Sequence, residues 1–474
     1  MPADFYAVIL TSGITPIGET LVNLSVRRWS SRFALSLLAT LPILLSATAL
    51  QAQDTFHLET SSGAASIRLA AANFKASSSN GDAYKNTFDT VLFSDLSNSG
   101  IFDMVSKSLA PQTTPGAPAE MNLSQWSQAP ASAAMVAFGN IGIQNGNLVA
   151  NGFLDDAKNA QFPQVFAKQY TGEPSEDTAR QLAHQFADDI IFRLSGGTPG
   201  IAESKLFYSK RIGPGEKEIW MMDYDGANQH AVTHLGEDSI SPRVSPDNSL
   251  IAFASLGKNG FQLRMYSLIL GRLVRFNNVG GTNLSPAWAP SGKELAFSSS
   301  RTGDPEIWIS DPQGSIAHRI TSYKGPDVSP TYNPKTGSQI AWISGRTGLP
   351  QLYIMDSDGS GVTRMTDGGY ATSASWSPNG QFIAFAWDRK YGPGAPGGQD
   401  IYVMEVATKR WIQLTHDIGR CDFPTWSPDG HHIAFSNSPD GADSHNRIMT
   451  MLVDGTQKRA LTGSGADMPN WSWK

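Results

Sequence analysis

A repeat of about 45 residues in the second half of the chain constrains the fold more than any other feature. Each copy carries a short anchor motif, which is most complete as WSPDG at Trp426. Related anchors begin at Val244, Trp288, Tyr332, Trp376, Trp426 and Trp471. The successive steps are therefore 44, 44, 44, 50 and 45 residues, and the long step contains an additional glycine- and proline-rich loop over residues 390–400. Repeats with a period of roughly 20–50 residues are typical of solenoids and propellers.

Short apolar strands follow the anchors. After Trp376, for example, come FIAFAW at Phe382, DIYVME at Asp400 and WIQLTH at Trp411. With the anchor itself, these segments make four strands in about 45 residues, which is the size of a propeller blade. The 45 glycines, 28 prolines and 12 tryptophans of the chain agree with this turn-rich β-structure. Coiled coils and helical solenoids need Ala, Glu, Lys and Leu instead.

The two ends of the repeat region complement each other. The first unit begins with KLFYSK at Lys205 and lacks an anchor, whereas the last anchor, at Trp471, has no strands after it. We expect the C-terminal strand to pair into the first blade and close the ring, because closure removes exposed sheet edges. The sequence thus predicts a six-bladed β-propeller over residues 201–474.

The segments just before the anchors are predicted to form a binding surface. The anchor turn joins the first two strands of a blade on one face, so the connections that lead into the anchors emerge on the other face. They include SISPRV at Ser239, NLSPAW at Asn283 and DVSPTY at Asp327. Each proline alone can simply shape a turn. Six such loops around one channel nevertheless predict a rigid binding surface.

Residues 53–200 contain no repeat and are predicted to form a separate domain. Strands are expected at residues 66–74, 101–106, 133–141, 147–154 and 164–170. Helices are expected at residues 82–100 and 175–197, the second with Ser175 as its N-cap. The predicted fold class is therefore an α/β N-terminal domain followed by an all-β six-bladed β-propeller, with a hinge at Thr198.

Residues 1–52 are predicted to be an N-terminal extension and a secretory signal peptide. A basic cluster that includes Arg27 and Arg28 precedes the uncharged stretch 33–50, and Ala47 and Ala49 have the spacing of a cleavage site. A stretch of this length could also just span a membrane. The small residues at its end favour cleavage over a membrane anchor.

Charge and cysteine content exclude further classes of function. The formal net charge of −6 gives no basic face for a nucleic-acid partner. Cys421 is the only cysteine in the sequence, so no internal disulfide can form. A buried, structural Cys421 is favoured over a reactive thiol.

Both predicted domains together resemble the TolB family, the periplasmic propeller proteins of the bacterial Tol–Pal envelope system. The resemblance rests on the signal peptide, on SDLSNSGIFDMVS at Ser94, and on six repeats of the WSPDG–IAFSS–IYVMD–LT kind. It covers nearly all of the predicted mature chain and implies a periplasmic, non-enzymatic adaptor without cofactor or metal. The implied role is to maintain outer-membrane integrity during cell division.

The resemblance also implies two protein partners. The peptidoglycan-associated lipoprotein Pal would bind the channel-mouth loops and hold the protein, as a monomer, at the periphery of the outer membrane. The positions carried over to the Pal site are Asp238, Ser239, Ser241, Asn283, Leu284, Ser285, Asp327, Ser329, Ser373, Asp422 and Asp467. The periplasmic domain of TolA would bind the start of the mature chain, at Asp54, Thr55, Phe56, His57, Leu58 and Glu59. A short peripheral segment of this kind can exchange between ordered and free states.

The alternative interpretation is an enzyme, a propeller-type polysaccharide lyase with a histidine-bound metal. Seven of the nine histidines lie in the propeller region. Those near outer strands, such as His234 and His416, would lie about 14 Å from the inner strands and could not converge on one metal. His431 and His432 belong to an anchor turn on the opposite face, so only His445 could approach the mouth. The sequence has no G-x-S-x-G or H-E-x-x-H motif either.

Overall fold

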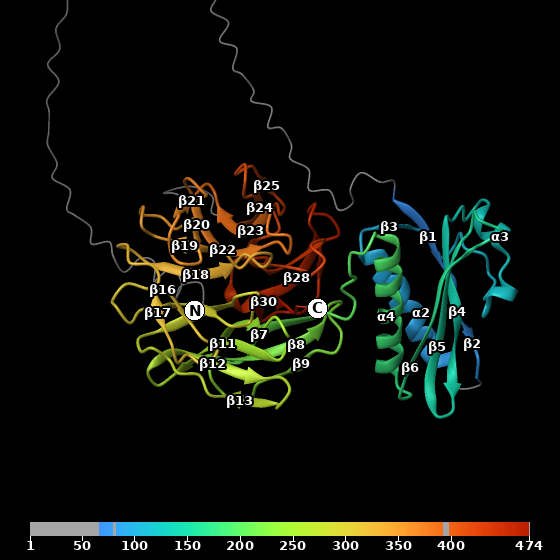
Figure 1. The fold of residues 1–474 in the computed structure, drawn as a ribbon, viewed down its shortest axis with the longest axis horizontal. Helices are drawn as coiled ribbons and strands as arrows, with labels where there is room; N and C mark the ends of the chain where they lie inside the picture. The colour runs from blue at the N-terminus through green and yellow to red at the C-terminus, as the bar shows by residue number, and fades with distance from the viewer. Residues whose placement is uncertain (1–65, 79–81, 392–397, 474) are drawn as a thin grey trace, which may run out of the picture.

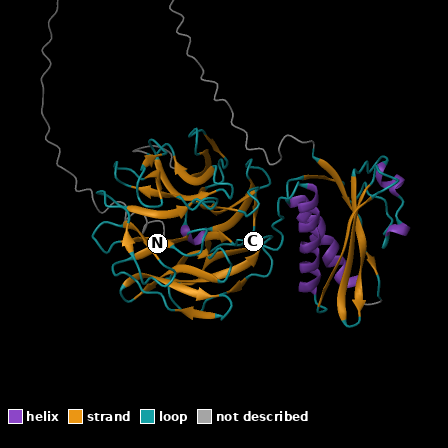
Figure 2. Cartoon of the chain, viewed as in Figure 1, coloured by secondary structure: helices purple, strands orange, loops and turns teal. Residues whose placement is uncertain are grey.

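The computed structural model describes residues 66–78, 82–391 and 398–473. Within these ranges the chain forms two domains that lie side by side, a small α/β domain and a ring of sheets (Figure 1). Almost all helix belongs to the small domain (Figure 2). The predicted signal peptide and residues 54–59 lie outside the described part of the chain. No helix in the described ranges combines the length and the apolar character needed to cross a membrane.

The small domain is a mixed sheet with two long helices on one face. The sheet order is β3-β1-β4-β5-β6, and β2 pairs with β4. Its strands are β1 (Ile67–Ala71), β2 (Lys75–Ala76), β3 (Phe102–Met104), β4 (Met135–Gln144), β5 (Asn147–Asp156) and β6 (Gln164–Gly172). Its helices are α2 (Asp82–Asn98), α3 (Leu123–Ser127) and α4 (Glu176–Leu194), with a 3-10 turn η1 (Pro118–Glu120). The β1 strand is parallel to β3 and β4, and the β4, β5 and β6 strands are antiparallel.

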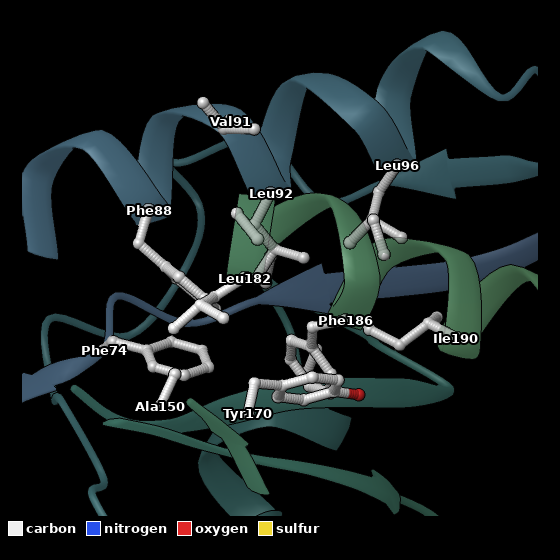
Figure 3. Packing of buried hydrophobic residues seen from close by; sticks show 14 of the residues in the cluster. Phe74, Phe88, Val91, Leu92, Leu96, Ala150, Tyr170, Leu182, Phe186 and Ile190 are labelled. Carbon is white, nitrogen blue, oxygen red and sulfur yellow. The ribbon is translucent and has the colours of Figure 1, made fainter. Parts of the chain in front are cut away.

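Helices α2 and α4 bury apolar side chains against the sheet (Figure 3). Phe88 and Leu92 of α2 lie four residues apart and share one helix face, as the sequence pattern predicts. Phe186 of α4 packs directly over Gly152 of β5, where a Cβ atom would lie 2.6 Å from the ring. Only glycine lets the helix approach the sheet so closely. The helix α4 begins at the predicted cap, because the Ser175 hydroxyl accepts a hydrogen bond from the backbone N–H of Thr178 (3.0 Å).

The other face of the sheet is covered by a segment for which the sequence predicted no element. Trp126 of α3 is 1% exposed and packs with Val136 and Phe138 of β4. The α3 helix is only five residues long, so it lacks the two or more turns from which an apolar period can be recognised.

The ring consists of six four-stranded sheets, which confirms the predicted six-bladed propeller. The inner strands are β30 (Ala466–Trp471), β10 (Ser239–Val244), β14 (Asn283–Trp288), β18 (Asp327–Tyr332), β22 (Tyr370–Trp376) and β26 (Arg420–Trp426). The second strands are β7 (Lys205–Gly213), β11 (Leu250–Gly257), β15 (Leu295–Ser299), β19 (Gln339–Ser344), β23 (Phe382–Asp388) and β27 (His432–Ser438). The third strands are β8 (Glu216–Asp223), β12 (Gly260–Ser267), β16 (Glu306–Ser310), β20 (Gln351–Asp356), β24 (Asp400–Glu405) and β28 (Arg447–Leu452). The outer strands are β9 (His230–Ala231), β13 (Arg272–Val274), β17 (His318–Arg319), β21 (Thr363–Arg364), β25 (Trp411–Gln413) and β29 (Arg459–Ala460), and a 3-10 turn η2 (Asp443–His445) precedes β28.

The predicted closure of the ring is also confirmed. The C-terminal strand β30 pairs antiparallel with β7, in a sheet of order β30-β7-β8-β9. The indole N–H of Trp471 in β30 donates to the hydroxyl of Ser204, just before β7 (2.7 Å). The last and the first strands of the propeller therefore stabilise each other.

A repeated threonine fastens the outer part of the blades. In the first blade the Thr233 hydroxyl accepts from the backbone N–H of Ile219 (2.9 Å) and donates to the carboxylate of Glu218 (2.5 Å). The same arrangement recurs with Thr321 and Glu306. The threonine of the sequence repeat thus has a structural role, since it satisfies buried polar groups at the start of the third strand, a role that Asn278 takes in the second blade.

A buried polar network joins the two domains. Asp95 of α2 accepts from His184 Nδ1 of α4 (2.7 Å) and from the Tyr224 hydroxyl, which follows β8 of the propeller (2.6 Å). All three side chains are at most 4% exposed. Beside them, Arg180 of α4 pairs with Asp225 of the propeller (2.7 Å). These contacts fix the helices of the small domain against one side of the ring.

Burial and neighbouring charges shift the pKa of His184 in opposite directions. Burial is the largest influence and lowers the pKa of His184, but the hydrogen bond and the charge of Asp95 outweigh it and raise that pKa above its ordinary value. Asp225 adds to the rise, and Arg180 opposes it. A raised pKa means that the folded state favours the protonated imidazole.

This network predicts a pH-dependent stability. Protonated His184 stabilises the folded chain below its unfolded pKa, and this contribution is lost as the pH rises through the raised folded pKa. In chemical unfolding from pH 6 to pH 9, wild-type protein should lose stability relative to His184→Gln, by about 1.4 kcal/mol for each unit of the pKa rise. The variant His318→Gln, at an exposed position in β17, should follow the wild type. Parallel curves for wild type and His184→Gln would contradict the prediction.

Candidate partner-binding mouth of the propeller

The propeller has two chemically different faces. We name the face with the anchor turns, and with the turns between third and fourth strands, the anchor face. The opposite face, with the connections into the inner strands and the hairpins between second and third strands, is named the mouth face. The small domain contacts the anchor face, where Asn98 O lies 2.7 Å from Nε2 of His432 at the start of β27. The mouth face carries the segments that the sequence predicted as partner-binding.

Every inner strand contains the same irregularity near the mouth face. The pairing register shifts there in all six blades. One non-glycine residue at each shift has a positive φ between 45° and 55°. These residues are Ser241, Ser285, Ser329, Ser373, Phe423 and Met468. Such backbone costs on the order of 1–3 kcal/mol per residue and is found mainly at functional sites, where a bulge changes the direction of a side chain.

The prediction that the Pal-binding residues lie in loops is wrong for all of them except Asp238. The others belong to the inner strands themselves. The prolines after the bulges lie within these strands and not in turns, because a bulge tolerates a proline within a strand. Ser239, Asn283 and Asp327 are fully buried, so their side chains are not open to a partner and serve to hold the inner strands in place. Asp238 lies outside the strands, 3.8 Å from the Lys217 ammonium.

The residues one position before the bulges divide the mouth into two halves. The apolar half is formed by Ile240, Leu284 and Val328, and the polar half by Thr372, Asp422 and Asp467. Ile240 and Leu284 pack in one cluster with Phe423 and Met468, although the four residues come from four different blades. The apolar core therefore runs continuously through these neighbouring blades.

The polar half concentrates acidic groups. Asp422 accepts from the Thr372 hydroxyl (3.1 Å) and from the backbone N–H of Phe423 (2.7 Å). Burial raises the pKa of Asp422 to about 6, and the nearby Asp467 adds to the rise. Hydrogen bonds from Phe423 and the charge of Arg420 oppose that rise only in part. The net charge of the mouth therefore changes close to neutral pH.

Exposed apolar side chains surround the mouth at the rim. They are Ile212, Leu256, Tyr323, Leu349 and Tyr391, with exposed fractions of 41–59%. They lie at the ends of second strands, in hairpins or in the connection before β18, and they come from different blades. Sequence reasoning missed them because it considered only the segments next to the anchors. A large apolar residue in a hairpin between two predicted strands was the signal that could have found them.

The anchor face is also hollowed. A cavity of about 370 Å³ opens there, lined by anchor tryptophans and prolines and by Pro199 of the interdomain connection. The indole N–H of Trp473 donates to Val244 O at its wall (3.2 Å). The tryptophans of this wall have their polar atoms bonded to the protein, so the wall is largely apolar.

The described residues do not bring the histidines together. Among them, no three His, Cys, Asp or Glu side chains form a group that could hold a metal ion. His445 lies on the mouth face but pairs with Asp440 in an exposed position (2.5 Å). Cys421 is fully buried, and burial raises the pKa of its thiol to about 12, which agrees with a structural role.

Comparisons with known proteins agree with both domains. The family model of the TolB beta propeller domain matches residues 192–473, and that of the TolB amino-terminal domain matches residues 60–161. The Tol-Pal system protein TolB of Gluconobacter oxydans is 32% identical over 391 residues, which are 81% of this chain and 82% of the relative. A protein TolB homolog of Chlorobium chlorochromatii is 29% identical over 301 residues, or 63% of this chain and 66% of the relative. The crystal structure of TolB from Acinetobacter baumannii has the same fold, with a TM-score of 0.72 at 22% identity over 86% of this chain and 97% of that one.

The buried carboxyl of the mouth generates a second prediction. Because the folded state raises the pKa of Asp422 to about 6, its charged form costs stability as the pH rises from the unfolded pKa through 6. Asp422→Asn should therefore gain roughly 2–3 kcal/mol over wild type between pH 4 and pH 7.5 in chemical unfolding. Asp367→Asn, at a side chain that is 94% exposed, should show no such gain. A difference from wild type that stays constant with pH would contradict the assignment.

Proposed function

Because the chain belongs to the TolB family, we propose that it is a periplasmic protein-binding adaptor of the Tol–Pal system. The predicted signal peptide supports export, and the mouth face offers a rigid surface for a protein partner. The adaptor links Pal, and through Pal the outer membrane, to TolA of the inner membrane. It thereby maintains outer-membrane integrity during cell division, and it acts as a monomer without catalytic residues, cofactor or metal.

Pal is proposed to bind at the mouth face. The observation that carries this proposal is the bulge with a left-handed, non-glycine residue in all six inner strands. A strained backbone that recurs six times around one opening supports a binding role more strongly than a packing role. The mouth is not occluded by the small domain, whose described contacts lie on the anchor face.

The chemistry of the mouth suggests how a partner is held. The apolar rim residues, with Leu284 beneath them, would bury apolar side chains of Pal. Ser373 and Asp422 on the polar half, and Ser329 beside Val328 on the apolar half, are partly exposed and offer hydrogen-bond acceptors, whereas Asp467 is buried. The buried positions Ser239, Asn283 and Asp327 would act by holding the strand ends in place.

TolA is proposed to bind residues 54–59 at the start of the mature chain. This segment alternates apolar and polar residues at Phe56, His57 and Leu58, a pattern that suits pairing with a strand of a partner. The segment shares no residue with the inner strands proposed to bind Pal. One chain can therefore contact both partners at once.

The rim generates a test of the Pal site with a matched control. Leu349→Ala removes an apolar side chain that is 41% exposed on the mouth face, and Leu270→Ala removes one that is 56% exposed on the anchor face. We expect Leu349→Ala to weaken the binding of purified Pal by about 5- to 30-fold in calorimetry, since burying the exposed part of a leucine side chain contributes about 1–2 kcal/mol.

The control distinguishes the loss of a specific Pal contact at the mouth face from the effect of removing any exposed apolar side chain. Leu270→Ala should bind Pal with the wild-type dissociation constant. Equal weakening by both variants, or no binding of wild-type protein at micromolar concentrations, would exclude the mouth as the Pal site.

The N-terminal segment generates an independent test. Deleting residues 53–60 should abolish measurable binding of the TolA periplasmic domain, because the proposed contacts are all in that segment. The circular-dichroism spectrum and the thermal transition should stay unchanged, since every described element begins at or after Ile67. Survival of TolA binding in the deletion variant would refute this part of the proposal.

A further inference from the structure

The small domain has an unpaired sheet edge beside the propeller. Strand β6 (Gln164–Gly172) pairs only with β5, and no other described segment pairs with its outer side. It is nine residues long, and most of its side chains are exposed or half-buried. An open edge of this length presents a row of backbone donors and acceptors, which an extended polypeptide can pair with.

A groove runs along this edge. Its volume is about 430 Å³, and it is lined by residues 168–171 of β6, by α4, and by Pro199 and Glu203 of the connection to the propeller. It therefore lies in the angle between the two domains. A strand added to β6 would place every second side chain into this groove, because side chains alternate along a strand.

The groove is acidic with one apolar wall. Asp189 of α4 accepts from the Lys168 ammonium (2.5 Å) and the Tyr170 hydroxyl (2.6 Å), and its side chain is still 34% exposed. Glu203 accepts from the amide of Gln185, whereas the carboxylate of Asp188 is buried and accepts from the backbone N–H groups of Ala202 and Glu203. Lys168 is the one basic residue of the lining.

The apolar wall is Phe192 of α4, whose side chain is 55% exposed. An aromatic side chain that remains open beside Asp189 and Glu203 suits a strand whose groove-facing residues are basic. Basic side chains would pair with Asp189 and Glu203, and their aliphatic stems would cover Phe192.

We propose that this groove binds an extended, basic segment of a partner protein, which adds as a strand to β6. The charge of the groove favours a partner segment over the chain's own N-terminal segment as its occupant. Residues 53–60 carry Asp54 and Glu59 and contain no lysine or arginine, so the acidic groove repels them. A lysine- or arginine-bearing strand gains both backbone pairing and charge complementarity.

The test uses the chain from residue 53 to residue 474 and a fluorescein-labelled nonapeptide of alternating Lys and Val, followed by fluorescence anisotropy. We expect binding in the micromolar range, and no binding of the matched peptide of alternating Glu and Val. The double variant Asp189→Asn with Glu203→Gln should weaken binding at least fivefold. Asp367→Asn, which removes an exposed charge on the propeller, should leave it unchanged.

Backbone methylation separates strand addition from simple charge attraction. One peptide carries N-methyl groups on its lysines and the other on its valines, so each has one edge blocked. Strand pairing predicts that one of the two loses at least tenfold in affinity while the other binds like the parent. Equal binding of both methylated peptides would overturn the proposal, as would equal weakening by Asp367→Asn.

Two further outcomes would also overturn it. If the Lys–Val peptide does not bind at 500 μM, which is about 500-fold above a dissociation constant of 1 μM, the edge does not accept a basic strand. If deleting residues 53–65 raises peptide affinity fivefold or more, the chain's own segment occupies the groove instead of a partner.

Discussion

The propeller depends on hydrogen bonds that its tryptophans make between neighbouring blades. The indole N–H groups of Trp288, Trp376 and Trp426 each donate to a backbone carbonyl of the preceding inner strand, at 3.0–3.2 Å. The indole rings are 4–6% exposed, so the same side chains also fill the space between the sheets. An inner strand in a ring cannot pair with the inner strand of the next blade, because the two belong to different sheets. In these three blades the tryptophan replaces that missing pairing, which gives the anchor tryptophan a structural role.

The inner strands are held at the anchor face, and near the mouth face they can therefore carry bulges with a positive φ. The bulges at Ser241, Phe423 and the equivalent positions lie on the same strands as the anchors, a few residues away. A left-handed residue persists only where the surrounding structure holds it in place. The pairing on both sides of each bulge and the packed cluster of Ile240, Leu284 and Met468 provide that support. The hydrogen bonds and packing of the inner strands therefore hold the strained bulges near the mouth face in one conformation.

The sequence was sufficient for the architecture because the repeat is a local signal that occurs six times. The blade strands, the ring closure and both long helices follow from motifs and apolar periods. The site was harder to predict, because its properties depend on contacts between blades. No local pattern shows that Ser239 and Asp327 are buried, or that apolar and acidic residues divide the mouth. The interdomain group of Asp95, His184 and Tyr224 spans 129 positions and leaves no periodic trace in the sequence.

The two domains are joined through buried polar groups, and this has a consequence for an adaptor. A carboxylate such as Asp95, 2% exposed, loses its hydration and depends on His184 and Tyr224 to replace it. Such a contact is specific in geometry, because separating the domains would leave Asp95 and His184 without the propeller's hydroxyl. An apolar interface of the same size would tolerate sliding. The polar network therefore favours one relative orientation of the small domain and the ring, and it keeps the acidic groove beside β6 and the mouth face on separate sides of the same molecule.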